Sequence, residues 1–246
     1  MNKSTVEEIR ARFDADVERF SNLNTGQVTA IDSPLGMELC AELATECVGH
    51  QPGSILDLGC GAGNYTLRFL QRLSASGRPA PSLIALNDLS LPMLHRAESR
   101  LRDAGYDGEI ELIHQDLRES QIADGQFDVI MAASVLHHLR TDAEWDTTFS
   151  NLHHWLRPGG GLFVYDLVSF ADPVTQSVMD RRYAEYLESI NGPDFRDHVL
   201  AYIAKEDTPR PVTWQLERLR AAGFTQTDLI HANGPFAVYS ARRAQD

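Results

Sequence analysis

Short apolar runs alternate with helical segments through the middle of the chain, between residues 54 and 168. The apolar runs are SILDL, SLIALN, EIELIH, FDVIMAA and GGLFVYDLV. Segments with apolar side chains at helical spacing separate them, among them YTLRFLQRL, LPMLHRAESRLRDAG and EWDTTFSNLHHWL. Strands that alternate with helices in this way form βαβ units, whose strands pair in parallel. The pattern predicts an α/β fold with an open, doubly wound, mostly parallel sheet.

Two helices are predicted ahead of this region. Val6 to Phe20 combines charged and apolar side chains in a way that suits a surface helix. Pro34 begins a second helix, which carries apolar residues at helical spacing. We therefore expect residues 1–33 to form an N-terminal helical segment beside the sheet.

The alternation of strands and helices breaks after Val168. Residues 169–210 contain no strand-like run and two weakly amphipathic segments, which predicts a helical insertion after the fifth strand that caps the sheet. A helix closed by Gly223 follows. Two further strand candidates, TDLIHA and FAVYSAR, are joined through Asn233 and Gly234, which predicts a hairpin at a sheet edge.

Length and composition favour one domain with a small-molecule partner. At 246 residues and 43% hydrophobic content, the chain suits a single well-buried domain over residues 1–246. Its 22 basic and 35 acidic residues give a net charge of −13, which disfavours a nucleic-acid partner. No run approaches the roughly 18 apolar residues of a membrane span, and the charged start lacks the apolar core of a signal peptide. We expect a soluble, cytoplasmic protein with no membrane contact.

A glycine-rich loop follows the first predicted strand, in the sequence ILDLGCGAGN. A dinucleotide fingerprint needs the spacing G-x-G-x-x-G, but the glycines here are Gly59, Gly61 and Gly63, and position 64 is Asn. A phosphate-binding P-loop would end in Gly-Lys-Ser or Gly-Lys-Thr, and no lysine lies nearby. The spacing therefore disfavours both NAD and ATP as the ligand.

Three aspartates stand at the ends of three successive predicted strands. Asp57 lies just ahead of the glycine loop, where a carboxylate repels phosphate and favours an ammonium or sulfonium group. Asp88 is placed to accept the two hydroxyls of a ribose, and Asp116 to accept the amino group of an adenine. A single aspartate is better explained as a helix N-cap. Three at successive strand ends indicate an adenosyl ligand with positive charge.

Five motifs in order give the chain a family resemblance. They are DLGCGAG at 57–63, NDLSLPML at 87–94, QDL at 115–117, FDVIMAASVLHHL at 127–139 and LRPGGGLFVYD at 156–166. With these motifs the sequence resembles the class I S-adenosylmethionine-dependent methyltransferases, closely over residues 35–168 and more loosely through LRAAGF at 219–224. The resemblance implies a Rossmann-like, seven-stranded sheet with one antiparallel strand near its edge, and S-adenosyl-L-methionine as the cofactor. Together, residues and resemblance give these candidate cofactor-binding positions: Asp57, Gly59, Gly61, Gly63, Asp88, Leu89, Asp116, Leu117, Ala132 and Ala133.

His137 is the candidate catalytic residue, because it follows the fourth strand at the expected mouth of the site. It could act as a general base that deprotonates the methyl acceptor. The alternative is that it caps or packs against the next helix. Tyr165 and Asp166, which end the fifth strand at the same rim, are weaker candidates.

No metal site is predicted. The histidine pairs 137/138 and 153/154 are adjacent in sequence, and adjacent residues of a helix point about 100° apart, so neither pair is expected to share one ion. The three cysteines, Cys40, Cys47 and Cys60, form no CxxC pair, which disfavours a zinc ribbon or a disulfide framework. We expect buried free thiols.

The resemblance implies in-line transfer of a methyl group to O, N or C of a small molecule, with residues 1–30 and 169–210 closing over the site. Positioning alone can supply about 7–11 kcal/mol of barrier reduction, so no catalytic triad is required.

A second hypothesis is a carboxy-S-adenosylmethionine synthase, whose layout is similar. That enzyme needs a fixed arginine for the extra carboxylate, and none occurs between Arg196 and Arg210. A third is a binding subunit without catalysis. Methylation of nucleic-acid amino groups is disfavoured, because ASVLHHL replaces an Asn/Asp-Pro-Pro-aromatic turn.

Overall fold

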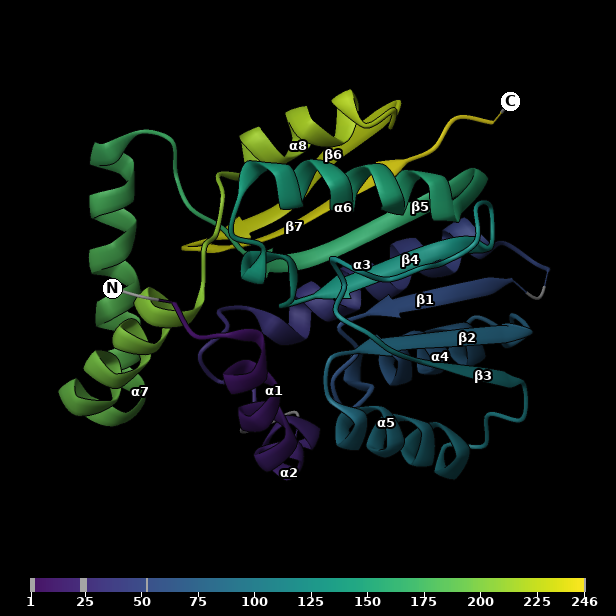
Figure 1. Cartoon of the computed structure of the whole chain (residues 1–246), viewed down its shortest axis with the longest axis horizontal. Coiled ribbons are helices and arrows are strands. Elements are labelled where there is room, and N and C mark those ends of the chain that lie inside the picture. Colours follow the sequence, from purple (N-terminus) through teal and green to yellow (C-terminus); the bar gives the residue numbers. More distant parts are fainter. Residues whose placement is uncertain (1–2, 23–25, 52, 246) are drawn as a thin grey trace.

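The structure of the chain is a computed structural model that describes residues 3–22, 26–51 and 53–245. A seven-stranded sheet forms the centre of this part of the chain (Figure 1). The strands are β1 (Ser54–Leu58), β2 (Leu83–Asp88), β3 (Glu109–His114), β4 (Phe127–Ala133), β5 (Leu156–Leu167), β6 (Gln226–Asn233) and β7 (Phe236–Arg242). Their order is β3-β2-β1-β4-β5-β7-β6, and β7 runs antiparallel to both of its neighbours. The predicted doubly wound, mostly parallel sheet is confirmed.

Helices cover both faces of the sheet, and one lies beyond the carboxyl ends of its central strands, on the left in Figure 1. They are α1 (Val6–Ala15), α2 (Val17–Ser21), α3 (Ser33–Val48), α4 (Asn64–Ala75), α5 (Leu91–Asp103), the short 3₁₀ helix η1 (Leu136–His138), α6 (Asp142–Trp155), α7 (Pro173–Glu206) and α8 (Val212–Ala221). The single helix expected over Val6 to Phe20 is wrong in one respect. Asp16 leaves helical geometry, with φ −109° and ψ 17°, and divides it into α1 and α2.

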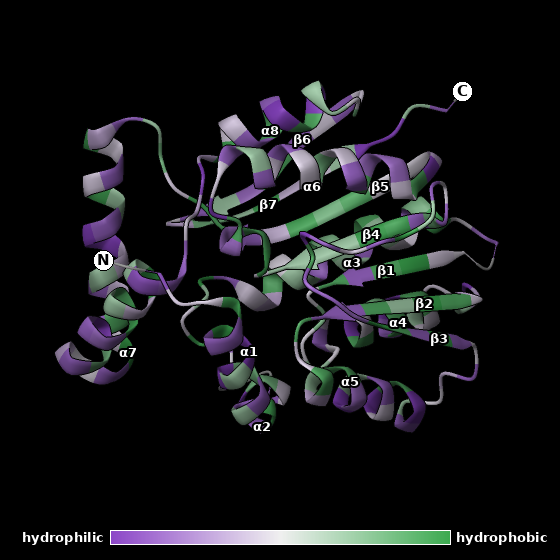
Figure 2. Ribbon diagram, viewed as in Figure 1, coloured by the Kyte–Doolittle hydropathy of each residue, from purple (hydrophilic) through white to green (hydrophobic). Residues whose placement is uncertain are grey.

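The core consists of two apolar layers, one on each face of the sheet. Because successive strand residues point to opposite faces, Ile55 packs in the layer covered by α3, α4 and α5, while Leu56 packs in the layer under α6 and α8. Both side chains are completely buried. Figure 2 shows hydrophobic residues along most of the central strands. Burial of each such side chain contributes about 1.5–3 kcal/mol, so the central strands form a firm base for the strand ends.

The carboxyl ends of β1, β2 and β4 point towards α1, α2 and α7, which we together call the cap (Figure 1). Within α7, Asn191 and Gly192 leave helical geometry, and the chain changes direction there. Its first part is held by Tyr183, whose hydroxyl donates to the Thr29 carbonyl at 3.0 Å. Its last turn is held by Glu206, which pairs with Arg12 of α1 at 3.0 Å. Segments from the two halves of the chain thus meet over the strand ends.

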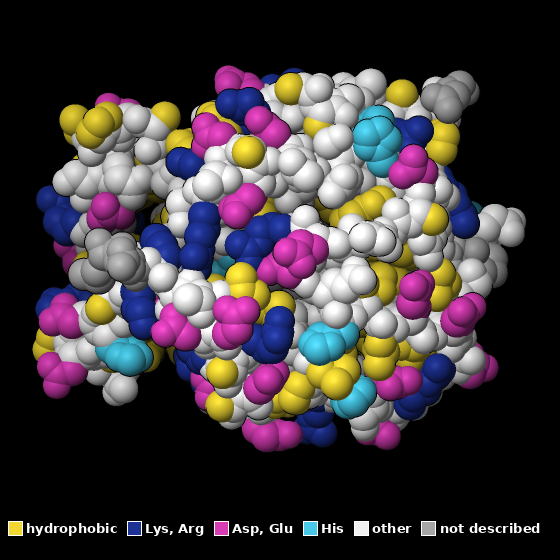
Figure 3. Space-filling model, viewed as in Figure 1, with side chains coloured by type: hydrophobic (Ala, Val, Ile, Leu, Met, Phe, Trp, Pro, Cys, Tyr) yellow, Lys and Arg dark blue, Asp and Glu magenta, His cyan; other side chains and the backbone are white. Residues whose placement is uncertain are grey.

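The C-terminal hairpin forms as expected at the edge of the sheet. β6 and β7 pair antiparallel through a turn in which Gly234 has φ +55°, a conformation that favours glycine. On the surface shown in Figure 3, basic and acidic side chains are interspersed. None of the helices in the described part of the chain is both long enough and apolar enough to span a membrane.

Candidate active site

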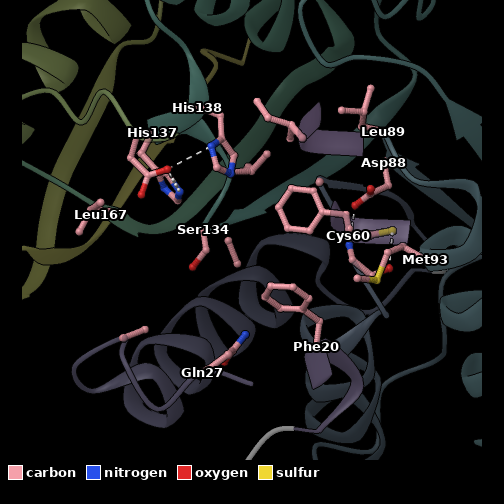
Figure 4. Close-up of a pocket in the computed structure, with 18 of the residues that line it drawn as sticks. Phe20, Gln27, Cys60, Asp88, Leu89, Met93, Ser134, His137, His138 and Leu167 are labelled. Atoms are coloured by element: carbon pink, nitrogen blue, oxygen red, sulfur yellow. Dashed lines mark hydrogen bonds and ion pairs between the residues drawn. The ribbon is translucent and has the colours of Figure 1, made fainter. Parts of the chain in front are cut away.

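A cavity of about 310 Å³ lies at the carboxyl ends of β1, β2 and β4, under the cap (Figure 4). The predicted residues that line it are Asp57, Gly59, Gly61, Asp88, Leu89, Asp116, Leu117, Ala133 and His137. The cap contributes Phe13, Phe20, Tyr183, Val199 and Tyr202 among others, and Gln27 lines the cavity from the segment between α2 and α3. The structure thus brings most of the candidate positions around one space. Their contact with a cofactor stays a prediction.

Gly59 and Gly61, the first two glycines of the loop, are surrounded differently. Gly59 has φ +65°, and a Cβ atom at this position would lie 2.4 Å from Cγ2 of Val135. Glycine therefore allows the loop after β1 to pack directly on the loop after β4. Gly61 has φ +50°, but a Cβ atom there would meet nothing within 4 Å. Its amide donates instead to Oδ2 of Asp88 at 2.8 Å, so the loop is fixed against the end of β2.

Two predicted positions do not line the cavity. Gly63, with φ +77°, begins α4, and a Cβ atom there would lie 3.1 Å from Cβ of Ala97 in α5. Its role is close packing of two helices. Ala132 is completely buried within β4, and the cavity wall begins one residue later, at Ala133. The wall continues through Ser134, whose φ of +54° is rare for a residue other than glycine.

Two of the three aspartates lie at one end of the cavity, where Asp57 is fully buried and Asp88 is partly buried. Burial raises the pKa of Asp57 to about 7, although the hydroxyl of Thr66 donates to its Oδ2 at 2.5 Å and lowers that pKa. Burial also raises the pKa of Asp88, whose Oδ1 accepts from the Ser90 amide at 2.8 Å. Each oxygen of Asp88 accepts one backbone amide, which leaves lone pairs for the hydroxyls of a ligand. This end of the cavity suits a ligand with hydroxyl groups and positive charge.

The third aspartate has a partner that was not expected from the sequence. Arg118 donates to Asp116 through Nε at 2.8 Å and through a second guanidinium nitrogen at 2.5 Å. Burial alone would raise the pKa of Asp116, but these bonds hold it below its usual range. Both oxygens of Asp116 are therefore engaged, and an adenine amino group would have to share them with Arg118.

His137 is held at the other end of the cavity by carboxylates (Figure 4). Its Nδ1 donates to Oδ1 of Asp166, and its Nε2 lies 3.7 Å from Oδ1 of Asp207. Burial alone would lower the pKa of His137, but Asp166 and Asp207 raise it to about 9. The ring must therefore lose its second proton before His137 can act as a general base or as a ligand. The general-base role of His137 stays a prediction.

His138 also lies at this end of the cavity. The expectation that the adjacent residues His137 and His138 point too far apart to share one ion is wrong. The rings of His137 and His138 have centroids 4.3 Å apart, because the two residues lie in a tight 3₁₀ turn. Nδ1 of His138 lies 3.3 Å from Oδ1 of Asp207. The pair thus converges on one carboxylate. The other pair, His153 and His154, shows no such convergence among the described residues.

Several lining residues carry no local signal in the sequence that marks them as part of a site. Phe20 and Gln27 belong to the N-terminal segment and reach the cavity through the fold (Figure 4). Asn64 connects this segment to the glycine loop, since its Nδ2 donates to the Phe20 carbonyl at 2.7 Å.

The predicted free thiols are present: Cys40 and Cys60 are buried, and Cys47 is partly buried. Burial raises the pKa of Cys60 well above its usual value, so this thiol is inert filling in the loop.

Comparison with known proteins identifies the family. A family model described as a methyltransferase domain matches residues 55–160. The ubiquinone/menaquinone biosynthesis C-methyltransferase UbiE of Vibrio campbellii is 30% identical over 193 residues, which is 77% of this chain and 71% of that protein. The chain belongs to the class I S-adenosylmethionine-dependent methyltransferases, as its motifs indicated, and S-adenosylmethionine is the cofactor of this family.

Other relatives match a smaller share of their own length. The UbiE protein of Vibrio parahaemolyticus is 31% identical over 132 residues, which is 53% of this chain and 47% of that protein. The chain therefore spans about half the length of the first curated relatives it matches. Among solved structures, an O-methyltransferase family protein from Burkholderia thailandensis has a TM-score of 0.64 at 18% identity, covering 96% of this chain and 62% of that one. The [4+2]-cyclase SpnF has a TM-score of 0.67 at 14% identity, covering 100% and 99%. These structures share the fold.

Proposed function

We propose that this chain binds S-adenosyl-L-methionine in the cavity and transfers its methyl group to a small molecule held under the cap. The observation that carries the proposal is the division of one cavity into two ends. The glycine loop and Asp88 form one end, and His137 with its carboxylate partners forms the other. Sulfonium and acceptor can thus approach each other within one cavity. Catalysis then depends mainly on alignment and on exclusion of water.

The chemistry of the cavity wall supports an acceptor with an apolar, ring-containing body. Phe13 and Phe20 of the cap, Tyr183 and Tyr202 of α7, and Phe236 of β7 all line the cavity. Aromatic side chains favour a flat apolar group, while a few polar groups fix its orientation. The UbiE relatives are named for methylation of carbon in quinone biosynthesis. A hydroxylated aromatic ring of that kind is the acceptor class to test first.

A carboxy-S-adenosylmethionine synthase is less well supported. Such an enzyme needs an arginine available for the added carboxylate. Arg12, Arg19 and Arg118 line the cavity, but Arg12 pairs with Glu206 at 3.0 Å, Arg19 with Asp16 at 3.4 Å and Arg118 with Asp116 at 2.5 Å. Each guanidinium thus pairs with a carboxylate of the chain, although Nε and Nη2 of Arg12 have no hydrogen-bond partner among the described residues.

Calorimetric titration with S-adenosylhomocysteine tests the cofactor site. The wild-type chain should bind it with micromolar affinity. Asp88→Ala should weaken binding by about 2–4 kcal/mol, or about 30-fold to 1000-fold, because two charge-assisted bonds to the ribose are lost. Asp103→Ala is the matched control, since Asp103 ends α5 on the exposed surface. Equal affinities in the two variants would remove Asp88 from the site. Formation of S-adenosylhomocysteine from S-adenosylmethionine with hydroxylated aromatic acceptors then tests the transfer.

A further inference from the structure

Three side chains at the acceptor end of the cavity are arranged as the ligands of a metal ion are. The ligand atoms of His137, His138 and Asp207 all lie within 4.8 Å of one another. Oδ1 of Asp207 lies 3.7 Å from Nε2 of His137 and 3.3 Å from Nδ1 of His138. In a tetrahedron with metal–ligand distances near 2.05 Å, neighbouring ligand atoms are about 3.3 Å apart. Small side-chain rotations therefore suffice to bring the three atoms around one ion.

The polar atoms of this group lack the hydrogen bonds that would explain it as a closed network. Nδ1 of His138 and Oδ1 of Asp207 are both buried and lie 3.3 Å apart as an ion pair, but neither atom makes a hydrogen bond of acceptable geometry among the described residues. The side chain of Asp207 is 4% exposed, and that of His138 is 18% exposed. Buried polar atoms without partners are costly, by about 1–3 kcal/mol each. Two such atoms that face one another are satisfied together when a cation lies between them.

Asp166 has the position of a supporting group. It accepts from Nδ1 of His137, which directs Nε2 of the same ring towards Asp207. Metal-binding histidines regularly donate their other ring nitrogen to a carboxylate in this way, because the bond fixes the ring and makes it a stronger ligand. The Asp166 oxygens also accept the backbone amides of His137 and Leu167, at 3.2 and 2.8 Å, so Asp166 itself is firmly held.

We propose that His137, His138 and Asp207 bind a divalent transition-metal ion, with Asp166 as the carboxylate that orients His137. Two imidazoles and one carboxylate suit Zn²⁺, Fe²⁺ or Mn²⁺, and not Mg²⁺ or Ca²⁺, which prefer oxygen ligands. Three protein ligands leave coordination positions open. All three residues line the cavity, so these positions face the methyl acceptor and can take one of its oxygen atoms. That last role rests on the proposed function, whereas binding of the ion does not.

Titration of the purified protein with Co²⁺ alone, followed by visible absorption, tests the site. We expect one Co²⁺ per chain, with absorption bands that Zn²⁺ abolishes by displacement and Mg²⁺ leaves unchanged. Asp207→Asn and His138→Gln should each weaken binding at least 100-fold. Asp166→Asn should weaken it about 10-fold to 100-fold. The matched control is the double variant His153→Gln/His154→Gln, which removes an adjacent histidine pair elsewhere and should bind Co²⁺ as the wild type does.

Each result of the Co²⁺ titrations supports or refutes the proposed metal site. Absence of stoichiometric Co²⁺ uptake by the wild type refutes the site, as does equal affinity in wild type and His138→Gln. Loss of binding in the control double variant would place the ion elsewhere. If Asp207→Asn does not fold, the wild-type spectrum and His138→Gln still decide. Titration of His138→Gln with S-adenosylhomocysteine distinguishes this proposal from the proposed function, because cofactor binding should be retained when the metal is lost.

Discussion

Replacement of Gly61 tests whether the glycine loop forms the wall of the cofactor site. Gly61 has φ +50°, and a Cβ atom there meets nothing within 4 Å. Gly77, after α4, offers a matched control: its φ is +64°, its Cβ position is equally open, and it does not line the cavity. Valine at either position adopts an unfavourable left-handed conformation, at a cost of about 1–2 kcal/mol. Gly61→Val and Gly77→Val should therefore lose similar stability in urea unfolding.

Ligand binding should separate the two variants. The valine methyl groups at position 61 enter the space at the cavity wall, whereas those at position 77 extend elsewhere. We expect calorimetric titration with S-adenosylhomocysteine to show at least a tenfold loss for Gly61→Val, or about 1.4 kcal/mol, and no loss for Gly77→Val. Normal binding by a folded Gly61→Val variant would refute the placement of the cofactor at this loop.

Three further predictions concern the loop, a buried acid and the cap. Gly59→Ala should lose about 1–3 kcal/mol more stability than Gly61→Ala, because its Cβ would lie 2.4 Å from Val135; equal losses in urea unfolding contradict this packing. Burial raises the pKa of Asp57 to about 7 in the folded chain. Between the lower pKa of the unfolded chain and pH 7, the Asp57 carboxyl is therefore protonated in the folded state and ionised in the unfolded state. Stability should then fall as pH rises, by about 2–3 kcal/mol from pH 5 to pH 7.5, and Asp57→Asn should remove this slope. Residues 173–206 should gain protection from hydrogen exchange when S-adenosylhomocysteine and an aromatic acceptor are both bound, as expected of a cap that closes; unchanged protection in every state leaves α7 structural.

The sheet could be predicted from sequence because its signals are local. Apolar runs of strand length fixed the strands of the parallel part, and Asn233 with Gly234 marked the hairpin that makes β7 antiparallel. The break between α1 and α2 was not predictable from periodicity, because Asp16 interrupts a pattern whose apolar and charged residues continue on both sides.

Only those residues of the candidate site that lie at the ends of strands could be predicted from the sequence. Asp57 and Asp88 lie at the carboxyl ends of β1 and β2, where parallel topology brings them together. The partners of His137 could not be found in the same way. Asp207 lies 70 positions further along the chain and reaches His137 only because α7 returns over the strand ends. The pair of Asp116 with Arg118 had a local signal, since an arginine two residues away can bond a carboxylate through two nitrogens.

The most direct test of the account is native mass spectrometry of the wild-type chain after incubation with equimolar S-adenosylhomocysteine and NAD, each well above micromolar concentration. The central claim is that the cavity at the strand ends holds an adenosyl-sulfur cofactor and not a dinucleotide. We predict a complex with one S-adenosylhomocysteine per chain and no NAD complex. A complex with NAD, or the chain in its free form alone, would contradict the account.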